Sequence, residues 1–83
     1  MEERYVRVGF KNYNGFYTGD YIYKDETKSG LQEGDLVKPK SYLDDNLIGA
    51  GKVLEINISN ERVEEAKRYY DIVSISYGYR RID

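Results

Sequence analysis

Carboxylates are the side chains of this 83-residue chain best suited to acid–base chemistry, because histidine and cysteine are both absent. Their absence excludes serine–histidine and cysteine–histidine nucleophiles, the usual proton shuttle near neutral pH and nearly every zinc site. The sequence holds two adjacent acidic pairs, Asp44-Asp45 and Glu64-Glu65. Adjacent side chains diverge rather than converge on one substrate atom, so we interpret both pairs as solvated charge. We therefore expect no enzymatic activity and no cofactor.

Tyrosine is the residue type that stands out, with 10 copies against two phenylalanines and no tryptophan. A core of this size holds fewer rings than that, since each buried hydroxyl needs water or a hydrogen-bond partner. We therefore expect several tyrosines on the surface. Exposed tyrosine favours binding, because the ring offers a large contact area at a low entropic cost.

The charge balance gives a net charge of −2, from 13 basic and 15 acidic residues. This is neither the basic excess of a nonspecific nucleic-acid binder nor the acidity of a DNA mimic. The first residues, M-E-E-R-Y-V, lack a signal-peptide pattern, and no segment approaches the roughly 18 apolar residues of a membrane span. We expect a cytoplasmic chain without a membrane partner, which the lack of cysteine also fits.

The first third of the chain predicts a β-hairpin. Residues 4–10 and 16–24 alternate with a period of two around Asn14-Gly15, a strong hairpin signal. In the returning strand we expect one set to face the barrel interior or rim: Tyr17, Gly19, Tyr21 and Tyr23. The other set is expected to face solvent: Thr18, Asp20, Ile22 and Lys24. We expect Gly19 to mark a bend or bulge, and Leu31 to close one end of the core.

The remaining residues predict three strands and one helix. Strands are expected at residues 35–38 and 52–58, joined by a long polar connection over residues 40–51. Residues 60–70 carry a narrow apolar stripe of Val63, Ala66 and Tyr70, which predicts a short helix with Asn60 as its cap. Alternation over residues 72–79 then predicts a closing strand, with Val73 and Ile75 among the residues on one face.

This order, β-β-β-β-α-β, predicts one domain over residues 1–83 that is mainly β. The best match is a small, five-stranded SH3-like barrel with one short helix before the last strand. An OB-like barrel is the alternative, although its helix usually lies between the third and fourth strands.

Two surface groupings are candidates for binding. The first is a set of loop residues that could contact a protein: Lys40, Tyr42, Leu43, Asp44 and Asp45. The second is a set that could stack on the bases of single-stranded nucleic acid and neutralise its phosphates: Tyr21, Tyr23, Lys24, Tyr79, Arg80 and Arg81. A solvated loop is the competing interpretation of the first set, and tyrosines inside the barrel that of the second.

Several short motifs carry a resemblance: V-x-V-x-F at residues 6–10, Y-x-Y at 21–23, G-D-L-V-K-P at 34–39, G-K-V-L-E-I at 51–56 and A-K-R-Y-Y-D-I-V at 66–73. The chain resembles small proteins encoded by phages and mobile elements. Its middle is similar to the barrel-like, DNA-end-binding N-terminal domain of the primosomal helicase. Lys38 stands where that domain usually has an apolar residue, and no residue matches its nucleotide-end pocket, so no functional residue carries over.

The resemblance implies a phage-like context, in which such proteins often bind and block host machinery, including host defences. The leading hypothesis is therefore a non-enzymatic module that inhibits or adapts a host protein. Single-stranded nucleic-acid binding is the first alternative. The second is sequestration of a small nucleotide by an oligomer of this chain, which requires tyrosines and arginines to converge between copies.

Overall fold

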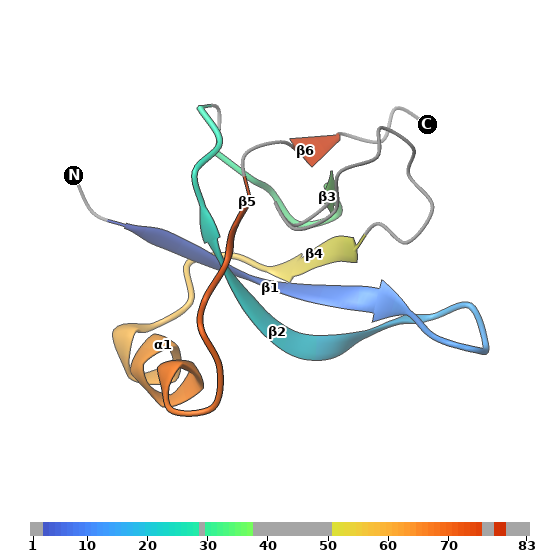
Figure 1. The fold of residues 1–83 in the computed structure, drawn as a ribbon. Helices are drawn as coiled ribbons and strands as arrows, with labels where there is room; N and C mark the ends of the chain where they lie inside the picture. The colour runs from blue at the N-terminus through green and yellow to red at the C-terminus, as the bar shows by residue number, and fades with distance from the viewer. Residues whose placement is uncertain (1–2, 29, 38–50, 76–77, 80–83) are drawn as a thin grey trace.

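The computed structural model describes residues 3–28, 30–37, 51–75 and 78–79 (Figure 1). Its elements, in chain order, are β1 (Arg4–Lys11), β2 (Tyr17–Asp25), β3 (Leu36–Val37), β4 (Gly51–Glu55), α1 (Asn60–Lys67), β5 (Ser74–Ile75) and β6 (Gly78–Tyr79). Within these residues no helix is long and apolar enough to cross a membrane.

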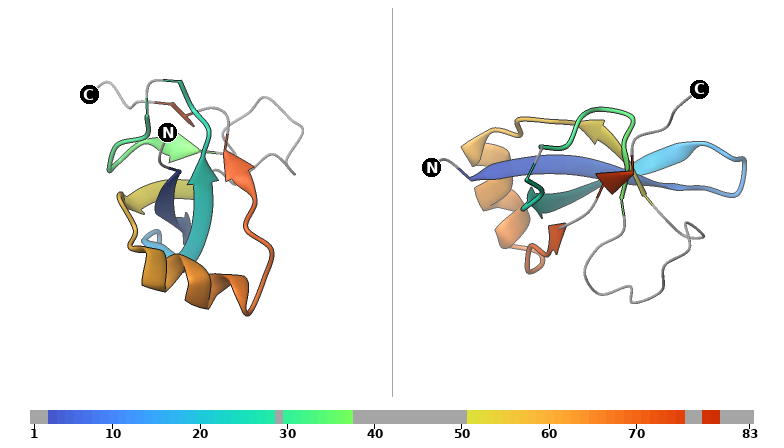
Figure 2. Two further views of the ribbon diagram at one scale, coloured as in Figure 1. Left: turned by 90° about the vertical axis from the view of Figure 1, so that its left-hand side faces the viewer. Right: turned by 90° about the horizontal axis from the view of Figure 1, so that it is seen from above.

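The strands form one sheet in the order β5-β2-β1-β4-β3-β6. β5 runs parallel to β2, and the other neighbours are antiparallel. β5 and β6 both fall within residues 72–79, the predicted closing strand, yet they pair with opposite edges of the sheet. The sheet must therefore curve until its edges approach each other, as Figure 2 shows. The predicted fold class is confirmed: a mainly β, five-stranded, nearly closed barrel with a short helix before the last strand.

The predicted hairpin is confirmed, and its loop is organised by Asn12. The Asn12 side chain accepts hydrogen bonds from the backbone N–H groups of Asn14 and Phe16, at 2.9 and 3.0 Å. Gly15 has φ +88°, which a left-handed turn residue requires. Farther along β2 the pairing with β1 shifts register, and Gly19 lies in this irregularity with φ +139°. The predicted bend at Gly19 is therefore confirmed as well.

Two apolar clusters lie on opposite faces of the β1–β2 ribbon, because neighbouring residues in a strand point to opposite faces. The barrel interior holds Val6, Val8, Leu31, Val37, Val53 and Ile75. The outer cluster, between the ribbon and α1, holds Tyr5, Ile22, Ile58, Val63 and Ala66. The prediction that Leu31 joins the core is confirmed.

The inside and outside assignment of β2 is wrong at Ile22. Ile22, expected to face solvent, is buried, because α1 covers the outer face of the ribbon. Tyr21, expected at the barrel interior or rim, is 52% exposed, and its ring packs edge-on against Phe10 with ring centroids 5.5 Å apart. Phe10 in turn packs against the interior cluster. Tyr23 does pack against the interior cluster. Alternation gives two faces, but it does not say which of them a helix will cover.

The helix ends earlier and the closing strand begins later than predicted. Ser59, rather than Asn60, caps α1, and its side-chain oxygen accepts from the N–H of Arg62 at 3.4 Å. Tyr70 was expected on the apolar stripe of the helix, but it follows the end of α1 and its hydroxyl accepts from the N–H of Ile22 at 2.9 Å. Val73 precedes β5 and is partly exposed, whereas Ile75 is fully buried.

Replacing Gly51 by alanine is expected to destabilise the fold by about 1–3 kcal/mol, the usual cost of overpacking a core. An added Cβ would overlap Cγ1 of the buried Val8 and lie 3.1 Å from the Phe10 ring. Thermal or denaturant unfolding measures this loss. Thr18→Ala, at an exposed position of β2, is the control, and equal stability of Gly51→Ala and the wild type would contradict the described packing.

Candidate binding surface at the hairpin end

The loop residues predicted to contact a protein, Lys40, Tyr42, Leu43, Asp44 and Asp45, lie outside the described residues. Their proposed role stays a prediction. The candidate surface at the loop end of the β1–β2 hairpin consists of other residues.

The set predicted for nucleic acid is only partly described. Arg80 and Arg81 lie outside the described residues, and Tyr79 lies in β6, opposite Leu36. Tyr23 is half-buried against the interior cluster, whereas the neighbouring Lys24 points to the other face of β2. The charge of Lys24 is compensated, since its Nζ lies 3.1 Å from Glu3 Oε1 and 3.9 Å from Glu26 Oε1. Tyr21 is the described member whose ring is most available for contact.

Three large aromatic side chains are exposed around the loop end of the β1–β2 hairpin. Tyr13 in the loop is fully exposed, Phe16 at its end is 69% exposed, and Tyr21 is about half exposed. In Figure 1 this end of the ribbon projects away from α1, and the third view (Figure 2, right) shows the same separation. The turn holds its shape through Asn12, so the rings are presented on an ordered backbone.

Two lysines lie on the neighbouring strands, Lys11 at the end of β1 and Lys52 in β4. Lys52 Nζ lies 5.5 Å from the ring centroid of Tyr17, a cation–π distance. Lys52 lies opposite Gly9 in the β1–β4 pairing. Lys11 is exposed at the end of β1. Within the described residues neither Lys11 nor Lys52 has a carboxylate at ion-pair distance. We call Lys11, Tyr13, Phe16, Tyr21 and Lys52 the hairpin end.

Other cations of the barrel wall are held by carboxylates. Arg62 of α1 contacts Glu55 at 2.7 Å, and Arg7 of β1 contacts the same carboxylate at 3.2 Å. Hydrogen bonds from Arg62 and then Arg7 lower the pKa of Glu55, so Glu55 stays charged at neutral pH. The two ion pairs of Glu55 connect α1 to the sheet. Because Arg62 and Arg7 are engaged in these pairs, Lys11 and Lys52 are better placed than the arginines to bind an acidic group of a partner.

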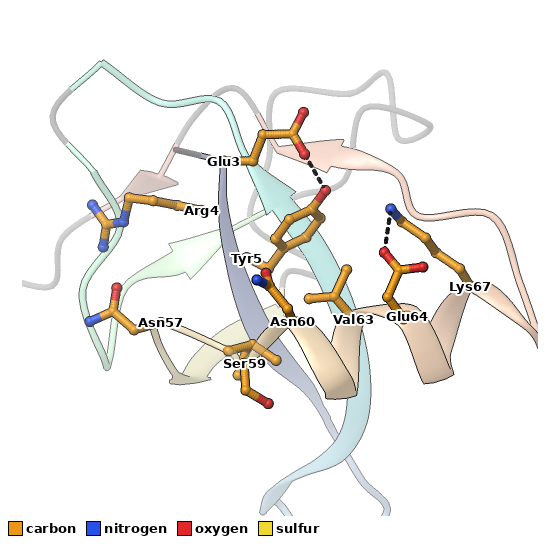
Figure 3. A pocket seen from close by; sticks show the side chains of 10 residues that line it. Glu3, Arg4, Tyr5, Asn57, Ser59, Asn60, Val63, Glu64 and Lys67 are labelled. Atoms are coloured by element: carbon orange, nitrogen blue, oxygen red, sulfur yellow. Dashed lines mark hydrogen bonds and ion pairs between the residues drawn. The ribbon is translucent and has the colours of Figure 1, made fainter. Parts of the chain in front are cut away.

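A cavity of about 580 Å³ lies between the start of β1 and α1 (Figure 3). Four of its polar side chains bind one another in pairs. The Tyr5 hydroxyl donates to Glu3 at 2.7 Å, and Lys67 contacts Glu64 at 3.3 Å. The bond to Glu3, followed by burial, raises the pKa of Tyr5 to about 12, and the bonds from Tyr5 and Lys24 lower the pKa of Glu3. Both pKa values therefore lie farther from neutral pH than usual, whereas a general acid or base works best with a pKa near the working pH.

In comparisons with protein-family models, curated proteins and solved structures, no match was found. What the hairpin end can bind follows from its own residues.

Sequence reasoning missed Tyr13 and Phe16 as binding residues, although a signal was present. Both lie in the segment that joins the two strands, on either side of Asn14-Gly15. Residues in a tight hairpin loop have no facing strand to pack against, so aromatic side chains there are candidates for exposure. An exposed loop aromatic is the kind of residue that anchors an interface.

Proposed function

We propose that this chain is a non-enzymatic binding module that docks a partner protein through the hairpin end. The observation that carries the proposal is the pair of exposed rings, Tyr13 and Phe16, on an ordered turn. Leaving such rings in water gives the isolated chain no packing energy. Covering them on a partner removes apolar surface from water at roughly 25 cal/mol per Å². Aromatic anchors of this kind dominate the energetics of many protein interfaces.

The charges favour an acidic protein surface over nucleic acid. Lys11 and Lys52 are the cations that the hairpin end offers. Each phosphate neutralised on a single strand adds only about 0.7 to the slope of log affinity against log salt, so two lysines support weak nucleic-acid binding. Two lysines and three exposed aromatic rings on the same part of the chain suit a protein patch with acidic residues and an apolar pocket.

Single-stranded nucleic acid is the second candidate partner. The observation that favours it is Lys52 over the Tyr17 ring, at a cation–π distance of 5.5 Å. Stacking of bases on aromatic rings with nearby cations is the usual way in which proteins bind single strands. Sequestration of a small nucleotide by an oligomer is a third proposal, with tyrosines and arginines meeting between copies.

The biological setting forms part of the proposal and is supported by the sequence resemblance. We propose a phage-derived protein that acts in the host cytoplasm and inhibits or adapts a host protein, as an anti-defence factor does. The near-neutral charge supports a protein target more than a nucleic acid.

A pull-down from bacterial lysate tests this proposal. The tagged chain is incubated with lysate that is untreated or treated with nuclease, and the recovered proteins are identified by mass spectrometry. We expect one dominant protein that survives nuclease treatment. Recovery of nucleic acid alone, with binding that weakens steeply as salt rises, would overturn the proposal in favour of the second candidate.

A further inference from the structure

A second hollow of about 440 Å³ lies between β2 and the C-terminal end of α1, apart from the loop of the hairpin. Its walls include Tyr69, Tyr70, Asp20 and Glu65, and Ala66 of α1 forms part of its floor. We call this hollow the tyrosine groove. It combines aromatic rings with acidic side chains, whereas the hairpin end combines rings with lysines.

The two tyrosine rings of the groove differ in how firmly the rest of the chain holds them. The Tyr70 hydroxyl accepts a hydrogen bond from the N–H of Ile22 at 2.9 Å, which fixes this ring against β2. Tyr69 is 78% exposed and packs little against the rest of the described chain. One ring is therefore already in place, and the other can close over a bound group with little loss of existing contacts.

Over the residues that the structure describes, the cations around the tyrosine groove are paired, whereas one of its carboxylates is not. Arg62, which also lines the groove, is held by Glu55 at 2.7 Å. Asp20 has a side chain that is 94% exposed, and Arg7 lies 3.7 Å from it, a distance at which solvent weakens the pair. In the described part of the chain no cation lies at ion-pair distance from Glu65. A cation entering the groove therefore meets Glu65, which has no ion-pair partner among the described residues, and Asp20, whose pair with Arg7 is exposed to solvent.

We infer that the tyrosine groove binds an arginine side chain on a partner protein. A guanidinium group stacks flat on a tyrosine ring and pairs with a carboxylate through two parallel N–H groups, which a lysine ammonium cannot do. Cation–π attraction to the rings adds to the ion pairs. The inference rests on the proposed function in one respect, that the partner is a protein. The occupant contacts a part of the molecule that the hairpin end does not use.

The test is an NMR titration of the ¹⁵N-labelled full chain with acetylated, amidated tripeptides. The probes are Gly-Arg-Gly, Gly-Lys-Gly, Gly-Glu-Gly and a citrulline tripeptide, in which a neutral group replaces the guanidinium. We expect saturable shifts of the amide signals of Ile22, Ala66 and Tyr70 with the arginine peptide, and at least threefold weaker binding of the lysine and citrulline peptides. Equal shifts with Gly-Glu-Gly, or no saturable shift with arginine, would refute the inference.

Variants separate the tyrosine groove from the rest of the surface. Tyr69→Ala and Glu65→Gln should each weaken arginine-peptide binding by about threefold or more, without changing the fold, because both side chains are exposed. Glu61→Gln, on the same helix but outside the groove, is the matched control. Tyr13→Ser with Phe16→Ser should leave peptide binding unchanged. Arginine binding that persists in this double variant, after the lysate partner is lost, shows that the groove and the hairpin end act separately.

Discussion

Replacing Asp25 by alanine is expected to destabilise the fold by about 3 kcal/mol, near the cost of breaking a buried ionic network. The Asp25 side chain is only 1% exposed. Its carboxylate accepts hydrogen bonds from the backbone N–H groups of Leu31 at 2.8 Å and Thr27 at 2.9 Å, and Arg4 lies 3.9 Å away. Because Leu31 is part of the barrel interior, loss of the carboxylate releases a core residue as well as the turn.

Denaturant unfolding of the wild type, Asp25→Ala and Asp20→Ala measures this effect. Asp20 is the matched control, since its side chain is 94% exposed and it lies on the same strand. Its removal should change the free energy of unfolding by less than about 0.5 kcal/mol. Similar losses for the two alanine variants would contradict the role assigned to Asp25.

The contribution of Asp25 should also depend on pH. Burial alone raises the pKa of Asp25, but hydrogen bonds from Leu31 and Thr27 and the charge of Arg4 outweigh it, so the pKa falls below the ordinary 3.8. A lowered pKa in the folded state means that the stabilisation is complete above pH 3.8 and is lost as the pH falls through the folded value. The stability gap between the wild type and Asp25→Asn should therefore narrow between pH 6 and pH 3. A gap that is constant over this range would count against an ionised Asp25.

Replacing Tyr13 and Phe16 together by serine is expected to reduce binding of the lysate partner at least 30-fold. Removal of a central aromatic anchor usually costs about 2 kcal/mol or more at an interface. The free energy of unfolding should change by less than about 0.5 kcal/mol, because both side chains are exposed and the turn is held by Asn12.

The partner recovered in the pull-down serves as the probe for this double variant, with affinity measured by surface plasmon resonance. Lys28→Ser with Glu33→Ser, two exposed positions between β2 and β3, is the control and should bind as the wild type does. Undiminished binding by the Tyr13 and Phe16 variant would remove the hairpin end from the interface.

Local signals in the sequence predicted much of the fold. Asn14-Gly15 located the hairpin, and Gly19 located its irregularity, because turns and bends require backbone angles that few residues adopt. Ile22 was misassigned because its burial depends on α1, which lies nearly 40 residues farther along the chain. The alternation of residues within one strand does not indicate which of its faces a helix from another part of the chain will bury.

The candidate site could be predicted only in part. Tyrosine abundance indicated a binding surface, and Tyr21 is exposed as that role requires. The sequence did not reveal that Lys24 is neutralised by Glu3 and Glu26, since these ion pairs depend on which side chains the fold places together. Nor did it reveal that the Tyr70 hydroxyl bonds to β2 and so helps to shape the tyrosine groove. Both facts depend on contacts between separate elements.

Site-specific photo-crosslinking in bacterial lysate tests the central claim most directly, because it captures a partner whose identity has not been determined. Tyr13 is replaced by the photoreactive residue p-benzoylphenylalanine, and a second protein carries the same residue in place of Glu61. Glu61 is exposed on α1, at the other end of the β1–β2 ribbon (Figure 1). The account predicts one nuclease-resistant protein adduct from position 13 and none from position 61. An adduct from position 61 alone, or no protein adduct from position 13, would contradict it.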